Sequence, residues 1–182
     1  MKKLLTITFI LLLFSYSGEV FAQDSDNTTA DARVLADITV TANRGLNFGD
    51  LTATAQTPSI SPGDGTDDAQ FEVEADESSS VTLEFTQLPE GASGGDGSTF
   101  TYYIENGAGD DMEMTFAATD AAWTNNDTFT GETSFDPTSA TPTATIDGDG
   151  TIYVWLGGDL AVTSGQASGD YTGTITLEAT YN

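Results

Sequence analysis

The last fourteen residues read Gly169-Asp170-Tyr171-Thr172-Gly173-Thr174-Ile175-Thr176-Leu177-Glu178-Ala179-Thr180-Tyr181-Asn182. From Tyr171 onward, apolar or small residues alternate with threonine and glutamate. Side chains of a β-strand point to opposite faces in turn, so this pattern predicts a strand with one buried and one solvent-exposed face. We expect it to be a pairing strand, whose in-phase residues are Gly169, Tyr171, Gly173, Ile175, Leu177, Ala179 and Tyr181.

Short strand patterns recur along the rest of the chain. Period-two apolar residues mark 34–41, 46–48, 71–73, 81–85, 100–104, 112–116, 143–146, 152–156 and 160–162, whereas residues 121–142 show the weakest pattern. Turn signals separate these runs, and Asp147-Gly148-Asp149-Gly150 predicts a β-hairpin. Helical periodicity is absent beyond the N-terminal 22 residues. Many short strands with frequent turns predict an all-β protein, an antiparallel β-sandwich or a barrel.

The composition excludes several kinds of chemistry. The chain has no cysteine and no histidine, which removes thiolate nucleophiles, Ser-His and Cys-His relays, and most zinc, copper and haem sites. Acidic residues are so abundant that no pair stands out as the acid and base of a glycosidase. We therefore expect a protein that is not an enzyme.

The charge balance is extreme. The sequence has 29 acidic and four basic residues, for a net charge of −25. Such a surface repels nucleic acid and anionic lipid. It suits a high-salt habitat, in which ions screen self-repulsion, and halophilic adaptation is one interpretation. Loose binding of divalent cations and simple solubility are the others.

The N-terminus has the organisation of a bacterial secretion signal. Lys2 and Lys3 precede an apolar run over residues 4–14, and Val20-Phe21-Ala22 places small residues at the −3 and −1 positions before Gln23. We predict a cleaved signal peptide (1–22), a flexible polar segment (23–33) and a single β-sandwich domain (34–182). The mature protein would lie in the periplasm, at the cell surface or outside the cell, without membrane insertion.

Aromatic and acidic side chains offer two candidate ligand sites. Tyr103, Tyr153 and Trp155 fall on the strand faces opposite the apolar residues, where exposed rings could stack on sugars or lie under a neighbouring loop. Asp147 and Asp149 could offer carboxylates to calcium, the one cofactor considered, although a turn uses the same residues. These candidates define an alternative function, a self-contained secreted binding module for polysaccharide or calcium.

Two motifs together carry a resemblance to known proteins. Leu46-Asn47-Phe48-Gly49-Asp50 lies near the start of the domain, while Gly169 is fourteenth from the end and Tyr181 is penultimate. The chain resembles a bacterial family of secreted domains of unknown function and the spore-coat-U-type subunits of chaperone–usher pili. The resemblance implies an immunoglobulin-like, pilin-like sandwich that lacks one strand and leaves a groove beside its final strand.

In such subunits a periplasmic chaperone first fills the groove, and the N-terminal extension of the next subunit then replaces it by strand addition. The donor segment here would be Val34, Ala36, Ile38 and Val40, because Gln23 to Arg33 has no alternating large apolar residues. The same residues could instead form the first strand of the domain's own sandwich. We expect an exported structural or adhesive subunit whose partners are other subunits of its own kind or a periplasmic chaperone.

Overall fold

The computed structural model describes residues 28–86, 88, 100–138 and 141–182, and the predicted signal peptide 1–22 lies outside this part. The chain divides into two units, Met1–Val34 and Leu35–Asn182. All described strands lie in the second unit, and the described residues contain no helix, which confirms the prediction of an all-β protein. Accordingly, this part of the chain includes no helix long and apolar enough to cross a membrane.

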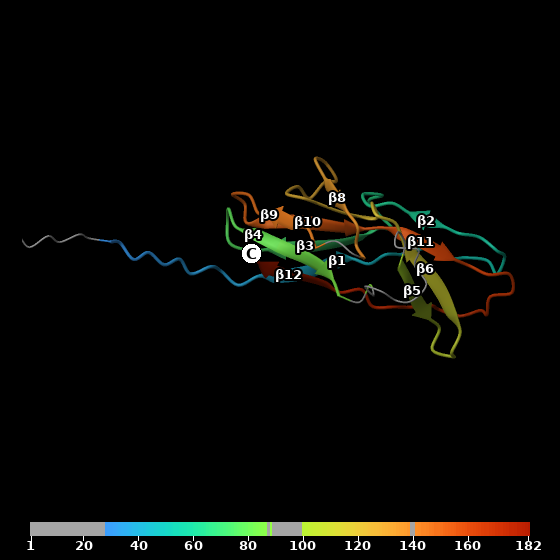
Figure 1. Ribbon diagram of the computed structural model, residues 1–182. Coiled ribbons are helices and arrows are strands. Elements are labelled where there is room, and N and C mark those ends of the chain that lie inside the picture. The colour runs from blue at the N-terminus through green and yellow to red at the C-terminus, as the bar shows by residue number, and fades with distance from the viewer. Residues whose placement is uncertain (1–27, 87, 89–99, 139–140) are drawn as a thin grey trace, which may run out of the picture. The chain divides into compact units, whose positions relative to one another are not determined.

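The strands of the described residues form three antiparallel sheets, ordered β1-β3-β10-β7-β8, β2-β11-β6-β5 and β12-β4-β9 (Figure 1). Their bounds are β1 (Thr39–Arg44), β2 (Ser59–Ile60), β3 (Ala69–Glu74), β4 (Ser80–Phe85), β5 (Phe100–Glu105), β6 (Asp111–Phe116), β7 (Ala121–Thr124), β8 (Thr133–Phe135), β9 (Thr143–Thr145), β10 (Thr151–Leu156), β11 (Gly158–Ala161) and β12 (Leu177–Tyr181).

The core lies where the sheets pack face to face. Phe85 of β4 meets Phe71 of β3 edge to face, with ring centroids 5.9 Å apart, and stacks on Phe135 of β8 at 6.1 Å. Alternate residues of the strands fill the same cluster, including Val73, Val81, Leu83, Met114, Phe116, Ile152, Val154 and Leu177. Sheets that share one apolar interior in this way make a β-sandwich, as the period-two pattern predicts.

A glycine joins two of the sheets. Only Gly157 separates β10 from β11, so an almost continuous strand leaves the first sheet and enters the second. A Cβ at Gly157 would lie 2.2 Å from the carbonyl oxygen of Ile60 and 2.9 Å from the backbone nitrogen of Pro62. Any larger residue would therefore push β2 away from β11.

The predicted hairpin at Asp147–Gly150 is wrong. The residues do form a turn, but β9 before it pairs with β4, and β10 after it pairs with β3 and β7. Backbone hydrogen bonds from Ala75 N to Gly150 O (2.9 Å) and from Ser78 N to Asp147 O (3.3 Å) tie the turn to the β3–β4 connection. The turn therefore carries the chain across the sandwich and does not return it beside β9.

Other strand boundaries also differ from the predicted ones. The first strand starts at Thr39, opposite Glu74, and continues through the predicted break to Arg44. The weakly patterned region 121–142 contains β7 and β8. By contrast, residues 45–55 form no strand, although Leu46 and Phe48 are in phase. Within this stretch Asn47 N donates to Asp67 O at 2.8 Å, but no strand ladder forms.

Asp120, in the connection between β6 and β7, has a raised pKa. Burial is the main cause; the 2.7 Å hydrogen bond from Ala117 N opposes the shift, and the nearby Asp159 and Asp136 add to it. A raised folded-state pKa means that folding favours the protonated carboxyl of Asp120. The stability that this group contributes is therefore fully present below its unfolded-state pKa and is lost as pH rises through its folded-state pKa.

We expect Asp120→Asn, which cannot ionise, to raise the Tm relative to wild type at about pH 7 and to leave it unchanged near pH 3. The asparagine oxygen can still accept the hydrogen bond from Ala117 N. Thermal melts of both proteins at the two pH values check this result. The same change in Tm at both pH values would contradict an electrostatic origin.

Candidate strand-binding groove

A groove of about 950 Å³ opens between two segments of the second unit. One wall runs from Ala42, near the end of β1, to Ala53. The other runs from Gln166 to Ile175, just before β12. We call the first wall the Leu46 segment and the second the Tyr171 segment. The two motifs that carry the resemblance, Leu46–Asp50 and Gly169–Gly173, thus face the same space.

The base of the groove reaches the apolar core. It is formed by side chains from β3, β5 and β6 and from the β11 region: Ala69, Phe71, Tyr102, Ile104, Met112, Met114, Leu160 and Val162. Most of these side chains are buried. An extended chain lying in the groove could therefore place every second side chain against the core.

Both walls present backbone groups without partners. Within the described part of the chain, the backbones of Tyr171, Gly173 and Ile175 form no hydrogen bond, and neither do those of Leu46 and Phe48. On the Tyr171 segment the residue between them is paired: Thr172 N donates to Glu105 O and Glu105 N to Thr172 O, each at 3.0 Å. Alternate bonding of this kind leaves one edge of the segment open to a further strand.

Contacts with β5 hold the Tyr171 segment in place. Tyr102 Oη donates to Thr174 O at 2.7 Å. A Cβ at Gly173 would lie 2.8 Å from Ile104 Cγ2 and from the Tyr102 ring, so only glycine lets the backbone pass this close to β5.

The predicted strand from Tyr171 to Tyr181 is confirmed for Leu177–Tyr181, which pairs with β4, and is wrong for residues 171–176. The reason is that these residues cross from β5 to β4.

Tyr181 connects the two sides of the groove at the end where the Leu46 segment adjoins β1 and the Tyr171 segment adjoins β12. Its hydroxyl accepts a hydrogen bond from Asp76 N and donates to Ala36 O, both at 2.8 Å. Ala36 N in turn donates to Asp76 Oδ2 at 3.3 Å. The groove lining accordingly stops at Ala42 and Ile175. The penultimate tyrosine thus ties the final strand to the segment before β1.

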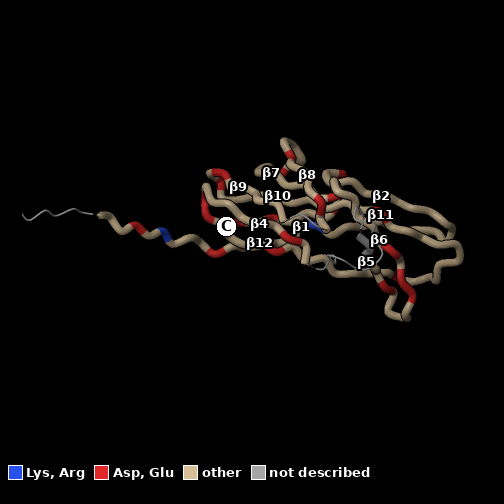
Figure 2. The backbone as a smooth tube through the Cα atoms, in the orientation of Figure 1, with Lys and Arg blue, Asp and Glu red and all other residues tan. Residues whose placement is uncertain are grey.

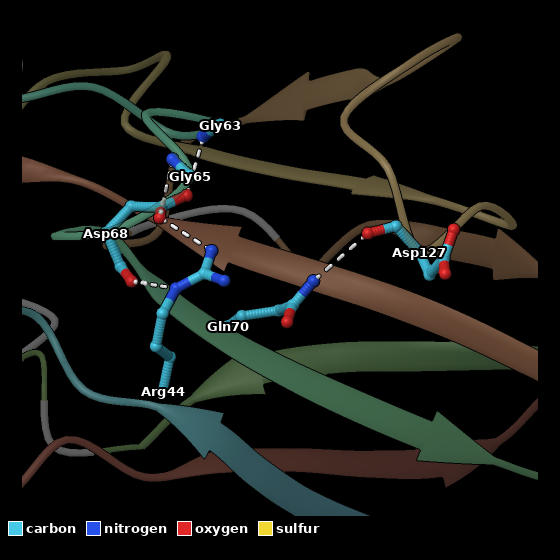
Figure 3. Close-up of polar contacts among 6 residues, drawn as sticks. All are labelled: Arg44, Gly63, Gly65, Asp68, Gln70 and Asp127. Atoms are coloured by element: carbon cyan, nitrogen blue, oxygen red, sulfur yellow. Dashed lines mark hydrogen bonds and ion pairs between the residues drawn. The ribbon is translucent and has the colours of Figure 1, made fainter.

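Arg44 fixes the base of the Leu46 segment to the β2–β3 connection (Figure 3). Its Nη2 lies 2.6 Å from Asp68 Oδ1, and its Nε donates to Asp68 O at 3.0 Å. The Asp68 side chain is 0% exposed and also accepts hydrogen bonds from Gly63 N (2.7 Å) and Gly65 N (3.1 Å). Periodicity did not reveal this ion pair; its one sequence signal is that Arg44 is the only basic residue after position 34.

The structure contradicts a donor role for part of the predicted donor segment. Val40 pairs with Val73 in β1, and both Val40 and Ile38 pack against the core of their own sandwich. Ala36 is held by Tyr181 and Asp76. Val34, at the end of the first unit, is exposed. Ile38 and Val40 cannot leave for another molecule without taking β1 out of its sheet.

The predicted aromatic surface is also not a single site. Trp155 is only 2% exposed and lies under Phe129, whose ring meets it edge to face at 5.3 Å. Tyr153 is half-buried 6.0 Å from Trp155, and burial, followed by Glu72, Asp127 and Glu74, raises its pKa. Tyr103 is 51% exposed on β5, in another sheet. An exposed role is thus wrong for Trp155, which lies under the loop after β7.

The acidic turn has a structural use. Asp147 Oδ1 accepts a hydrogen bond from Asp149 N at 3.0 Å, which stabilises the turn itself. Among the described residues there is no group of three or more acidic side chains that could hold a metal ion. The geometry therefore gives no support to Asp147 and Asp149 as a calcium site.

Acidic residues lie on both walls of the groove. Four of the 29 acidic residues and three of the four basic ones precede residue 35, which leaves 25 acids and Arg44 in the second unit. Figure 2 shows the acids spread along strands and loops. Asp50 and Asp170 line opposite walls of the groove and are exposed, whereas Arg44 is paired with Asp68. An occupant of the groove meets a negative potential at its rim.

Together, the fold and this site define an antiparallel β-sandwich with a core-lined groove between two segments whose alternate backbone groups have no partner in the described part of the chain. The chain belongs to the family described as Domain of unknown function (DUF4402), whose family model matches residues 38–181. No curated protein and no solved structure matches the chain at a significant level. The matched range contains both walls of the groove.

Proposed function

We propose that this protein is an exported, non-enzymatic structural subunit that assembles at the cell surface by accepting a β-strand from another protein in the groove. The observation that carries the proposal is a pair of backbone edges that line the same groove above the core. In the described part of the chain, the backbone groups of Leu46 and Phe48 on one edge, and of Tyr171, Gly173 and Ile175 on the other, have no hydrogen-bond partner. A strand placed there would hydrogen-bond to both walls and complete an immunoglobulin-like, pilin-like sandwich.

Strand addition also accounts for the shape and chemistry of the groove. Recognition of this kind combines a main-chain hydrogen-bond ladder with pockets for alternate side chains. Each aliphatic side chain buried against Phe71, Met112 or Met114 contributes about 1.5–3 kcal/mol. Assembly by this route needs no disulfide, and the sequence has no cysteine. The resemblance to chaperone–usher pilus subunits supports the same interpretation, with a periplasmic chaperone as an earlier occupant.

A synthetic strand peptide tests the proposal on the mature protein. The peptide is Lys-Val-Thr-Val-Asn-Ile-Ser-Ile-Thr-Lys with a fluorescent label, and its control has the same composition without alternation, Lys-Val-Val-Thr-Asn-Ile-Ile-Ser-Thr-Lys. We expect the alternating peptide to bind one per chain and the control to bind at least about tenfold more weakly, since it cannot place its aliphatic groups on one face. Equal binding of both peptides, or binding of neither, would refute strand addition.

Variants on the groove wall locate the binding site. Ile175→Asp places a charge where the peptide would pack, and we expect it to weaken peptide binding at least about tenfold. Phe48→Asp should do the same from the opposite wall. Thr145→Asp adds the same charge at an exposed position of β9 and should bind like wild type. Melting curves show whether each variant is folded; unchanged binding by both folded wall variants would place the peptide elsewhere.

A further inference from the structure

The structure allows us to specify further the strand that we propose for the groove. We infer that the strand that fills it comes from a different and less acidic protein, and not from residues 23–40 of a second copy of this chain. The inference rests on the proposed function and names the kind of partner. Two independent features of the chain carry it: the use that the structure makes of residues 36–40, and the charge around the groove.

The first feature is the absence of a suitable donor in this part of the sequence. An occupant must offer large apolar side chains at alternate positions to reach Phe71, Met112 and Met114. Residues 23–33 read Gln-Asp-Ser-Asp-Asn-Thr-Thr-Ala-Asp-Ala-Arg, in which alanine is the largest aliphatic side chain. In phase with Val34, the next large apolar residues are Ile38 and Val40, and both are packed in their own sandwich. Leu35 falls in the other phase and is followed there by the polar residues Asp37 and Thr39.

Releasing Ile38 and Val40 would be costly. Val40 pairs with Val73 inside the β1–β3 ladder, whose register runs from Thr39 to Arg44. The same strand leads directly into the Arg44–Asp68 ion pair. A second copy that donated these residues would lose its own first strand and, with it, the start of its Leu46 segment. Head-to-tail assembly of identical copies through residues 23–40 would thus destroy the groove that the next copy needs.

The second feature is electrostatic. The exposed carboxylates Asp50 and Asp170 line the rim, and the unit around them has 25 acidic residues against Arg44 alone. Residues 23–33 add Asp24, Asp26 and Asp31 against Arg33. A segment with this charge is repelled from the rim, whereas a strand with basic ends is attracted. The groove therefore favours a partner that differs from this chain in charge as well as in pattern.

Three peptides on the mature protein separate these possibilities. The first is the strand peptide with lysine ends defined above. The second is the same peptide with aspartate ends, Asp-Val-Thr-Val-Asn-Ile-Ser-Ile-Thr-Asp. The third copies residues 23–34 of this chain. In low salt we expect the lysine-ended peptide to bind at least about tenfold more tightly than the aspartate-ended one, with the difference closing in high salt. The residue 23–34 peptide should not bind.

The protein alone provides the complementary measurement. We expect sedimentation to give a monomer at all concentrations, and removal of residues 23–33 to change neither the mass nor the affinity for the lysine-ended peptide. Binding of the residue 23–34 peptide, or polymers of the protein alone, would overturn the inference, whether or not removal of residues 23–33 disperses the polymers. Equal affinity of the lysine-ended and aspartate-ended peptides in low salt would overturn its charge component. Failure of all three peptides to bind would instead refute the proposed function.

Discussion

Replacing Arg44 by methionine is expected to lower the free energy of unfolding by about 3 kcal/mol, because it leaves a buried carboxylate without its counter-charge. Asp68 would keep only the amides of Gly63 and Gly65 as partners. Methionine preserves most of the apolar stem of arginine, so the loss reports on the ion pair more than on packing. Urea unfolding of the variant and the wild type measures the difference.

Ser164→Asp is the matched control. It makes the second unit more negative by the same amount, but at an exposed position in the turn that follows β11. We expect its stability to stay within about 0.5 kcal/mol of wild type. If Arg44→Met lost no more than Ser164→Asp, the Arg44–Asp68 pair would have no structural role, and the Leu46 segment would need another anchor.

Gly157→Ala is expected to cost about 3 kcal/mol, since overpacking of this size forces backbone to move. The added Cβ would meet the carbonyl oxygen of Ile60 at 2.2 Å, and neither group is the end of a flexible side chain. We expect β2 to separate from β11, with a lower Tm and a lower urea midpoint. Circular dichroism melts of the purified variant check this result.

Gly148→Ala makes the same chemical change where there is room. A Cβ there would have no heavy atom within 4 Å, and Gly148 does not have a left-handed φ. We expect this variant to match wild type or to gain up to about 1 kcal/mol, because alanine restricts the unfolded chain. Equal destabilisation by the two substitutions would contradict a specific close approach at Gly157.

The sequence predicted the class of fold but not the pairing of its strands. Period-two alternation identifies β3, β4, β6 and β12 because each has one face in the core. The turn at Asp147–Gly150 shows only that the chain changes direction. Which strand it then joins depends on long-range contacts, here those with Ala75 and Ser78. Local turn chemistry does not contain that information.

The groove could be predicted in part. The two motifs, Leu46–Asp50 and Gly169–Gly173, lie on its two walls. Alternation alone, however, assigned strands to both segments, because an unpaired extended segment with one half-buried face has the same pattern as a paired strand. The ion pair between Arg44 and Asp68 was missed because partners 24 residues apart leave no periodic signal. The sequence likewise does not decide whether Trp155 is exposed or buried under a loop, because Phe129, which covers it, comes from a loop that is distant in the sequence.

Amide hydrogen exchange of the Tyr171 segment, with and without the lysine-ended strand peptide, tests strand addition most directly. At peptide concentrations about 100 times the Kd, we expect exchange at Tyr171, Gly173 and Ile175 to slow about a hundredfold. Thr172 serves as an internal control, because its amide is already bonded to Glu105 O and should change far less. Bound peptide without slower exchange at Tyr171, Gly173 and Ile175 would contradict the account.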